Sequence, residues 1–545
     1  MATTDESTGA WFGADGQVSQ LRGQLFKASC LGATLLALFL VFVFLVYVAV
    51  DAIEPASADP SWWATVVATV AVPGIVLSVY YYRFDPRAGE VAYTAVGLPV
   101  AATLLAGGVG IVFRHIVSPH EWFALTVAAL VAYGVLELHD RVRAAGAFER
   151  AAISAFVIVF TIVGLPGLVP SVRSLLLSLP VLPAAPLSLL GTFVVPVALV
   201  TGWYVRHARE SERAGLIAGG STVAAAALGV VSGPLVVVSW TTWLLLTTVV
   251  GVPVGLYVEG VFRRGEGVSG LALPVVLAAG AVICAGVVDM AGFAGPDIWL
   301  NWEFLTTAHN RTPREAGIYP ALVGSVMMII VVAIAAFPVG IGAAIYLEEY
   351  APNEGMFGSF VELIEINIAN LAGVPSVVYG LLGLTLFVKS GGLRPGIVIV
   401  GGLTVALLIL PIVIVSSQEA IRSVPDSQRQ AAYGMGATKW QTTRSVVLPR
   451  AMPGILTGTI LALGRAIGET APLLMVGVAA VVRISPDSFY GLFSAMPRQL
   501  YSWAGLAQPD FYHGVLAAGV LVLLIVLLMM NGTAILLRNK YQRND

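Results

Sequence analysis

Two charged residues stand four positions apart within an apolar stretch of the sequence. Arg465 and Glu469 occur in the segment GRAIGETAPLL, and this spacing predicts that both lie on one face of a helix. Because a charge at the centre of a bilayer costs roughly 2.5–3.5 kcal/mol, we expect them to face water or a bundle interior. Arginine also suits the oxygens of a phosphate-like anion. The pair, with the adjacent Thr470, is a candidate anion pathway; an internal ion pair that only latches two helices is the alternative.

A second feature is a proline inside another apolar run. Pro375, followed by Ser376, lies between Gly373 and Gly380. A proline there is expected to break or kink a membrane helix, which is tolerated where the backbone lines a cavity or is buried in protein. We therefore add Pro375 and Ser376 to the candidate pathway. Plain helix packing around a proline kink is an equally good interpretation.

A third feature is a polar, basic segment, 416–454, between two apolar runs. Small residues in it are followed by a glycine and then by an apolar step that ends in proline, at Gln430, Ala431, Ala432, Gly436, Val446, Leu448 and Pro449. The alanines suit a short helix, the glycine permits a left-handed turn that ends it, and the proline is expected to restart the chain towards the membrane. Such a helix–turn–helix can dock in a groove of a soluble partner. An ordinary polar loop is the alternative.

Membrane helices must position these residues. The chain has 545 residues, of which 58% are hydrophobic and 11% charged, whereas soluble domains are about 25% charged. Its fold class is therefore all-α, a polytopic helical membrane protein with about 14 transmembrane helices. We expect spans near 30–50, 62–82, 92–113, 122–138, 152–171, 187–205, 214–232, 235–259, 272–294, 318–347, 366–388, 397–415, 453–482 and 512–537.

The basic residues are distributed unevenly between the two sides of this arrangement. Most of the 29 lysines and arginines fall on the side that carries segment 416–454 and both termini. The positive-inside rule makes that side cytoplasmic and puts the segment around Phe304 outside. We therefore expect a multi-pass protein of the cell (plasma) membrane with cytoplasmic N- and C-termini.

The two halves of the chain differ in character. Residues 1–270 hold about eight expected spans with short connections, no fixed repeat and no motif that we can connect to chemistry. Residues 271–545 contain all the features described above. We expect a boundary at the basic stretch 262–270, with an N-terminal membrane extension of unknown role before it.

From about Leu271 onwards, the sequence resembles the PstA-type permease subunit of phosphate ABC importers, a group within the binding-protein-dependent import permeases. The resemblance rests on ordered motifs, namely NWEFLT, AGIYPALVGS, PVGIGAAIYLEEYAP, LAGVPSVVYGLLGL and GRAIGETAPLLMVG. Segment 416–454 matches the family's coupling loop, E-A-A-x3-G-x9-I-x-L-P. Two positions depart from it, because Gln430 replaces the usual Glu and Val446 the usual Ile.

This resemblance implies a six-helix ABC import permease core in residues 271–545, with 416–454 as its ATPase-coupling loop. It implies the translocation subunit of an ATP-driven inorganic phosphate importer. The expected partners are a second, PstC-type permease, an ATPase subunit dimer that binds ATP-Mg, an extracellular phosphate-binding protein, phosphate and membrane lipid. A permease for another oxyanion remains an alternative. So does a membrane sensor or regulatory scaffold, in which the extension carries the function.

Several motifs are missing from the sequence. It has no G-x-x-x-x-G-K-[ST] phosphate loop, no Cys/His cluster with metal spacing and no G-x-S-x-G nucleophile motif. We therefore expect no catalytic residue, metal or cofactor in this chain, and ATP hydrolysis on a separate chain. No feature indicates nucleic-acid binding, and the two cysteines, both in apolar runs, do not suggest a disulfide framework.

Overall fold

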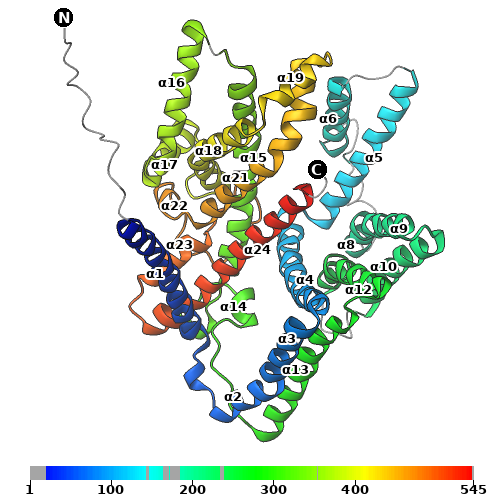
Figure 1. Ribbon diagram of the computed structural model, residues 1–545, viewed down its shortest axis with the longest axis vertical. Coiled ribbons are helices and arrows are strands. Elements are labelled where there is room, and N and C mark those ends of the chain that lie inside the picture. The colour runs from blue at the N-terminus through cyan, green and yellow to red at the C-terminus, as the bar shows by residue number, and fades with distance from the viewer. Residues whose placement is uncertain are drawn as a thin grey trace, which may run out of the picture.

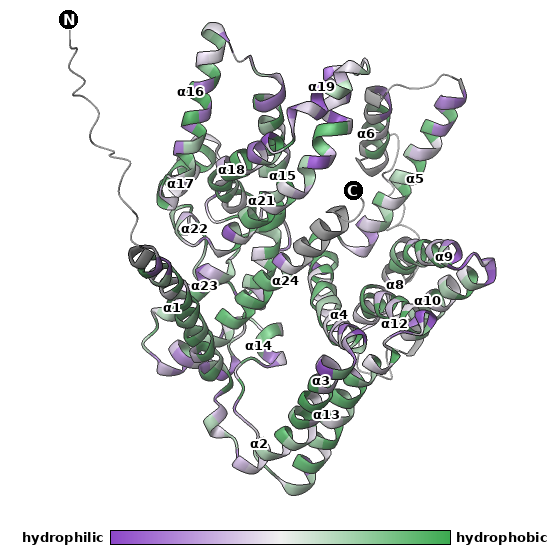
Figure 2. Cartoon of the chain, in the orientation of Figure 1, coloured by the Kyte–Doolittle hydropathy of each residue, from purple (hydrophilic) through white to green (hydrophobic). Residues whose placement is uncertain are grey.

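The structure is a computed structural model that describes residues 20–142, 147–163, 171, 184–232, 239–352 and 354–542. Throughout these ranges the chain is helical apart from turns and loops, with one isolated β-bridge between Ile397 and Leu492. The all-α fold class is therefore confirmed. Hydrophobic residues cover most helices, and hydrophilic ones gather near helix ends and on α19 (Asp426–Gly434) (Figure 2).

The helices of the N-terminal half are α1 (Gln20–Ile53), α2 (Pro60–Val66), α3 (Val72–Phe84), α4 (Pro86–Ile111), α5 (Pro119–Val142), α6 (Ala147–Val163), α8 (Ala184–Leu189), α9 (Val195–Arg209), α10 (Glu212–Ser232), α11 (Trp240–Leu245), α12 (Val252–Arg264) and α13 (Ala272–Ala291). Those of the C-terminal half are α14 (Trp302–Thr306), α15 (Tyr319–Ile345), α16 (Gly355–Ala372), α17 (Ser376–Gly383), α18 (Val398–Arg422), α19, α20 (Lys439–Thr442), α21 (Leu448–Gly468), α22 (Ala471–Met475), α23 (Met496–Ala504) and α24 (Leu516–Gln542) (Figure 1).

Many of these helices are joined or extended by single turns. The π-helical turns are η2 (Val67–Ala71), η3 (Val112–Ile116), η4 (Leu190–Val194), η6 (Leu246–Gly251), η9 (Tyr346–Tyr350), η10 (Leu384–Ser390), η11 (Thr443–Val447) and η12 (Phe511–Val515). The 3-10 turns are η1 (Pro55–Ser57), η7 (Val268–Leu271) and η8 (Pro313–Glu315). Helices α3, α9, α12 and α21 each have a proline as second residue directly after a π turn. The wider turn makes room for a ring that would otherwise clash with the preceding carbonyl.

Ten helices of the described residues are long and apolar enough to cross a membrane, or eleven if one bent pair counts as a single span. The exact number of fourteen is therefore not confirmed. Helices α6, α8–α9 and α10 stand at the expected spans 152–171, 187–205 and 214–232, but they are not among the ten. The end of the span at 152–171, the start of the one at 235–259 and the tight turn at 233–234 lie outside the described residues.

The apolar run near 453–482 is not a single span, which corrects the sequence-based expectation. Its helix begins at Lys439 and ends at Gly468, and Glu469 is already extended, with ψ of 126°. Pro472 accounts for this end, because it has no N–H to donate to the carbonyl of Gly468, four residues earlier, and its ring would clash with that carbonyl in a continuous helix. Only the short α22 follows.

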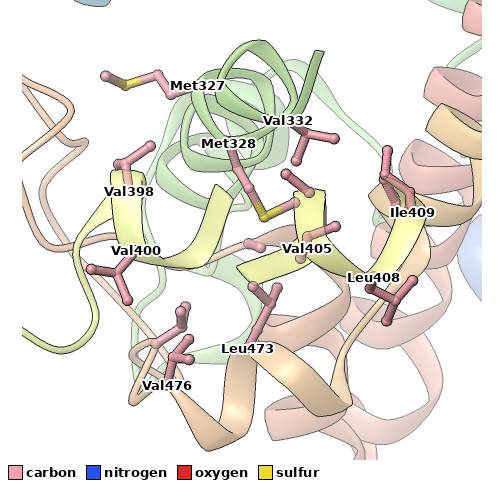
Figure 3. Packing of buried hydrophobic residues seen from close by; sticks show 14 of the residues in the cluster. Met327, Met328, Val332, Val398, Val400, Val405, Leu408, Ile409, Leu473 and Val476 are labelled. Carbon is pink, nitrogen blue, oxygen red and sulfur yellow. The ribbon is translucent and has the colours of Figure 1, made fainter. Parts of the chain in front are cut away.

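Helix α18 is the central element of the C-terminal half. Within its most apolar window 67% of the residues are buried, compared with 6% for α1. Neighbouring helices approach it where side chains are absent: a Cβ at Gly402 would lie 2.6 Å from Val331, and one at Gly383 would lie 2.2 Å from Thr404 Oγ1. Figure 3 shows Met328 of α15 pointing towards α18, with Leu473 of α22 on the other side of the cluster.

The first helix packs with the last one and not with its neighbours in sequence. Helix α1 lies beside α24 and η12 (Figure 1), and His513 Nδ1 lies 3.1 Å from Asp51 Oδ2. Trp299, in the connection after α13, donates from its backbone to Ala52 and from its ring to Glu54. In contrast, α13 packs against α2, η2 and α3. Helix α1 thus packs with the last helix of the chain, and α13 with early ones, while the domain boundary at residue 270 stays a prediction.

Candidate functional site

The coupling loop 416–454 is mostly helical. Helix α18 continues to Arg422, and the short α19 follows. Gly436 has φ of 83°, so the expected left-handed turn is present. The backbone N–H of Gly436 donates to Tyr433, and that of Ala437 to Ala432, which closes the end of α19. The position of a glycine within a polar segment was thus enough to predict this turn from the sequence.

The chain returns at Thr438 and not at Pro449. Thr438 forms a capping box with Gln441, in which each side chain accepts from the other residue's backbone N–H. From there a continuous helix runs to Gly468. The expectation that Pro449 restarts the chain is therefore wrong, since π turn η11 accommodates this proline inside the helix.

The motif residues of the coupling loop divide into two sets. Ala432 is buried, and Leu448 packs against the apolar cluster at the ends of α15 and α18. Gln430, Ala431, Gly436 and Pro449 are exposed. The motif did not predict the apolar residues that the turn exposes, namely Tyr433, Met435 and Trp440. Large apolar residues within a polar segment were the signal for them.

A network of ionic contacts surrounds the base of the coupling loop. Arg429 of α19 binds Glu349 of η9 through Nε at 3.1 Å and Nη2 at 3.0 Å. Arg422 Nη2 lies 2.7 Å from Glu348 Oε1, and Gln418 donates to both Glu348 and Glu365 at 3.0 Å. None of these residues belongs to the motif of the coupling loop. The two adjacent glutamates of IYLEEYAP, at the end of an apolar run, were the available signal.

Arg465 and Glu469 do form an ion pair, with Arg465 Nε 3.1 Å from Glu469 Oε1. However, Arg465 lies in the last turn of α21, whereas Glu469 caps that helix in an extended conformation and Thr470 begins the turn into α22. The two residues thus lie at a chain break and not on one continuous helix.

Pro375 breaks its helix as expected. Helices α16 and α17 with η10 meet at an angle of 106°, and Pro375 caps α17, with Ser376 as its first residue. The second arm of this bent pair packs directly on α22, since a Cβ at Gly380 would lie 2.8 Å from Pro472 Cα. The structure therefore brings the break at Pro375 and the break after Arg465 into neighbouring helices.

Comparisons with known proteins identify the family of the chain. Residues 336–540 match the family described as binding-protein-dependent transport system inner membrane component. The phosphate transport system permease protein PstA of Mycobacterium leprae is 37% identical over 39% of this chain and 68% of its own length. PstA 1 of Mycobacterium tuberculosis strain H37Rv is 35% identical over 45% of this chain and 82% of its own length.

Part of the chain matches solved structures of ABC transporters at low TM-scores. An inward-facing MetNI methionine ABC transporter has a TM-score of 0.31 and 15% identity, over 40% of this chain and 93% of that one. An amino acid ABC transporter with histidines has a TM-score of 0.30 and 16% identity, over 40% and 92%.

The chain is helical and membrane-spanning, has a left-handed turn at Gly436 between two spans, and matches this family. It is therefore a permease of a binding-protein-dependent transport system. Within that class, the chain belongs to the family of the phosphate transport system permease proteins PstA.

Proposed function

We propose that this chain is the membrane-spanning subunit of an ATP-driven inorganic phosphate importer and that a separate ATPase supplies the energy. The observation that carries the proposal is the coupling loop of a PstA-family chain, whose turn at Gly436 exposes Met435 and Trp440. Exposed apolar and aromatic residues on a compact turn suit a groove in a soluble partner. ATP binding would close the ATPase dimer, push this turn and switch the pathway between its two openings.

For the pathway, we propose the two neighbouring chain breaks. Arg465, Glu469 and Thr470 belong to one of them, and Pro375 and Ser376 to the other. Helix breaks expose backbone groups, which are tolerated at membrane depth where they line a passage. The side chain of Arg465 is 45% exposed, and its guanidinium would supply the positive charge that an oxyanion requires.

The proposal includes partners and an orientation. A second, PstC-type permease would complete the pathway, an ATPase dimer with ATP-Mg would bind the coupling loop, and an extracellular binding protein would deliver phosphate. Charge asymmetry supports a cytoplasmic coupling loop and cytoplasmic termini in the cell membrane.

Uptake of labelled phosphate tests the proposal, in cells that lack every other phosphate importer and express this chain with its ATPase, second permease and binding protein. We expect uptake that depends on ATP and resists competition by excess sulfate. Stronger competition by another oxyanion would make that anion the substrate. If the chain copurifies with no ATPase and supports no uptake, it is a sensor or scaffold and the proposal is wrong.

A further inference from the structure

We propose that Arg429 and Glu349 form the positioning contact through which the coupling loop moves helix α15. Neither residue belongs to the motif that identifies the loop. The inference rests on the proposed function, because it concerns how movement of that loop reaches the membrane helices.

The contact joins three helices through one guanidinium. Arg429 of α19 places Nε and Nη2 at 3.1 and 3.0 Å from Glu349 Oε1, in the turn that extends α15. It also donates to the backbone carbonyls of Val424 and Ile421, at the end of α18. Its side chain is 16% exposed and that of Glu349 is 5% exposed. An ion pair so well shielded from water is directional and is little weakened by salt.

The neighbouring carboxylate has different partners. Glu348 binds Arg422 and Gln418, both on α18, and Gln418 continues to Glu365 on α16. Two consecutive glutamates of η9 therefore bind side chains on different helices. Glu348 fixes α15 to the membrane helices α16 and α18, whereas Glu349 is the ionic link from α15 to α19.

Helix α15 is well placed to pass on a displacement. With η9 it forms one continuous helix of 32 residues, Tyr319–Tyr350. Its buried side packs along α18, and its residues Met327, Met328 and Val332 are fully buried there. Close-packed cores transmit strain and do not absorb it. A pull on Glu349 therefore reaches the core that contains Leu473, next to the chain breaks of the candidate pathway.

A second, weaker contact also links the coupling loop to η9. Lys439 Nζ, in α20 after the Gly436 turn, lies 5.4 Å from the ring centroid of Tyr350. Both sides of the coupling turn thus touch η9. A lysine over an exposed tyrosine contributes less than a partly buried arginine contact made through two nitrogens, so we assign the main role to Arg429 and Glu349.

The test uses the complete transporter in proteoliposomes with its binding protein, and it measures ATP hydrolysis, labelled phosphate uptake and ATPase copurification. For Glu349→Gln we expect normal copurification, at least half of the wild-type hydrolysis, and at least a tenfold fall in phosphate transported per ATP. Arg429→Lys should lower this ratio less, because the charge remains but the fork is lost. The matched control is Glu419→Gln, since the side chain of Glu419 is exposed and, among the described residues, forms an ion pair only with Arg422 of its own helix, at 3.7 Å.

The outcomes distinguish a failure of the proposed function from a failure of the proposed Arg429–Glu349 contact. If the wild-type complex transports no phosphate, the proposed function is wrong. If the wild type transports and Glu349→Gln keeps the normal ratio, only the inference is overturned. If Glu349→Gln does not assemble, Glu349→Asp keeps the charge and shortens the side chain by one methylene; assembly with at least a threefold lower ratio supports the inference, and an unchanged ratio overturns it.

Discussion

Arg465 binds Glu469 through Nε alone, although its guanidinium has two further nitrogens. The Nε–Oε1 distance is 3.1 Å, and the side chains are 45% and 14% exposed respectively. No other hydrogen bond of Arg465 occurs within the described part of the chain. The side chain of Glu469 is thus the more sheltered of the two, whereas that of Arg465 is partly exposed and has two nitrogens that Glu469 does not bind.

The first prediction distinguishes this pathway role from a latch. Arg465→Lys should lower phosphate uptake at least tenfold, because a single ammonium cannot bind Glu469 and an anion in the geometry of a planar fork. The double change Arg465→Gln with Glu469→Gln should remain inactive even though no charge is stranded. Uptake is measured with expression and ATPase binding checked for each variant. Recovery of transport in the double variant would show that the pair is only a latch.

The second prediction concerns the coupling turn. Gly436→Leu should lower uptake at least tenfold and weaken ATPase copurification, because a side chain in the left-handed region costs roughly 1–2 kcal/mol and enlarges the exposed tip. Gly434→Ala is the control, since Gly434 is helical and a Cβ there meets no atom within 4 Å. It should keep uptake within about twofold of wild type. Equal uptake by the two variants would contradict a role for the turn.

The third prediction concerns helix packing and compares two glycines of α15. A Cβ at Gly324 would lie 2.1 Å from the carbonyl oxygen of Ser494, whereas one at Gly342 meets nothing within 4 Å. Gly324→Ala should therefore destabilise the protein by about 1–3 kcal/mol through overpacking, and Gly342→Ala should be neutral or slightly stabilising. Thermal unfolding in detergent measures both. A lower unfolding temperature for Gly342→Ala alone would contradict the packing described here.

The fourth prediction is a pH dependence at the end of the molecule opposite the coupling loop. Trp503 Nε1 donates to His309 Nδ1 at 3.0 Å, and burial, with help from Arg483, lowers the pKa of His309 below its ordinary 6.5. The unfolded chain then binds the proton more readily, so this contribution is present above about pH 6.5 and is lost as the pH falls through the folded pKa. The unfolding temperature should fall on acidification, and less so in His309→Asn. Identical pH profiles would exclude His309 as the cause.

The fifth prediction concerns orientation. The two free cysteines, Cys30 and Cys284, are first replaced by serine and alanine. Single cysteines are then introduced at Met435 and Trp302, which are 83% and 78% exposed. An impermeant thiol reagent added to intact cells should label the cysteine at position 302 and not the one at position 435, because basic residues favour the cytoplasmic side. Permeabilised cells should label both. Labelling of both in intact cells would overturn the orientation.

Local chemistry explains what the sequence could predict. Gly436 and Pro375 act within a few residues of their own positions, so the left-handed turn and the broken helix were both predictable. The helix end at Gly468 was missed because hydropathy continues through it, although Pro472 was visible in the sequence.

Contacts between distant residues could not be predicted in this way. Arg429 and Glu349 are 80 positions apart, and nothing in either local segment specifies its partner. The same holds for α1, whose apolar sequence suits lipid on every side, so its place beside α24 depends on residues near the other end of the chain. Predicting such pairs requires the packing of the whole bundle.

The contact between α1 and α24 also has a consequence for biosynthesis. Asp51 and His513 are separated by 462 positions. A ribosome that adds roughly 5–20 residues per second completes that interval in about 23–92 s. During this time α1 is in the bilayer without the helix that later packs beside it, while α2 to α13 are inserted and can pack among themselves. Packing of α1 against α24 is therefore one of the last events of synthesis. A chain truncated before α24 leaves its first helix without this partner.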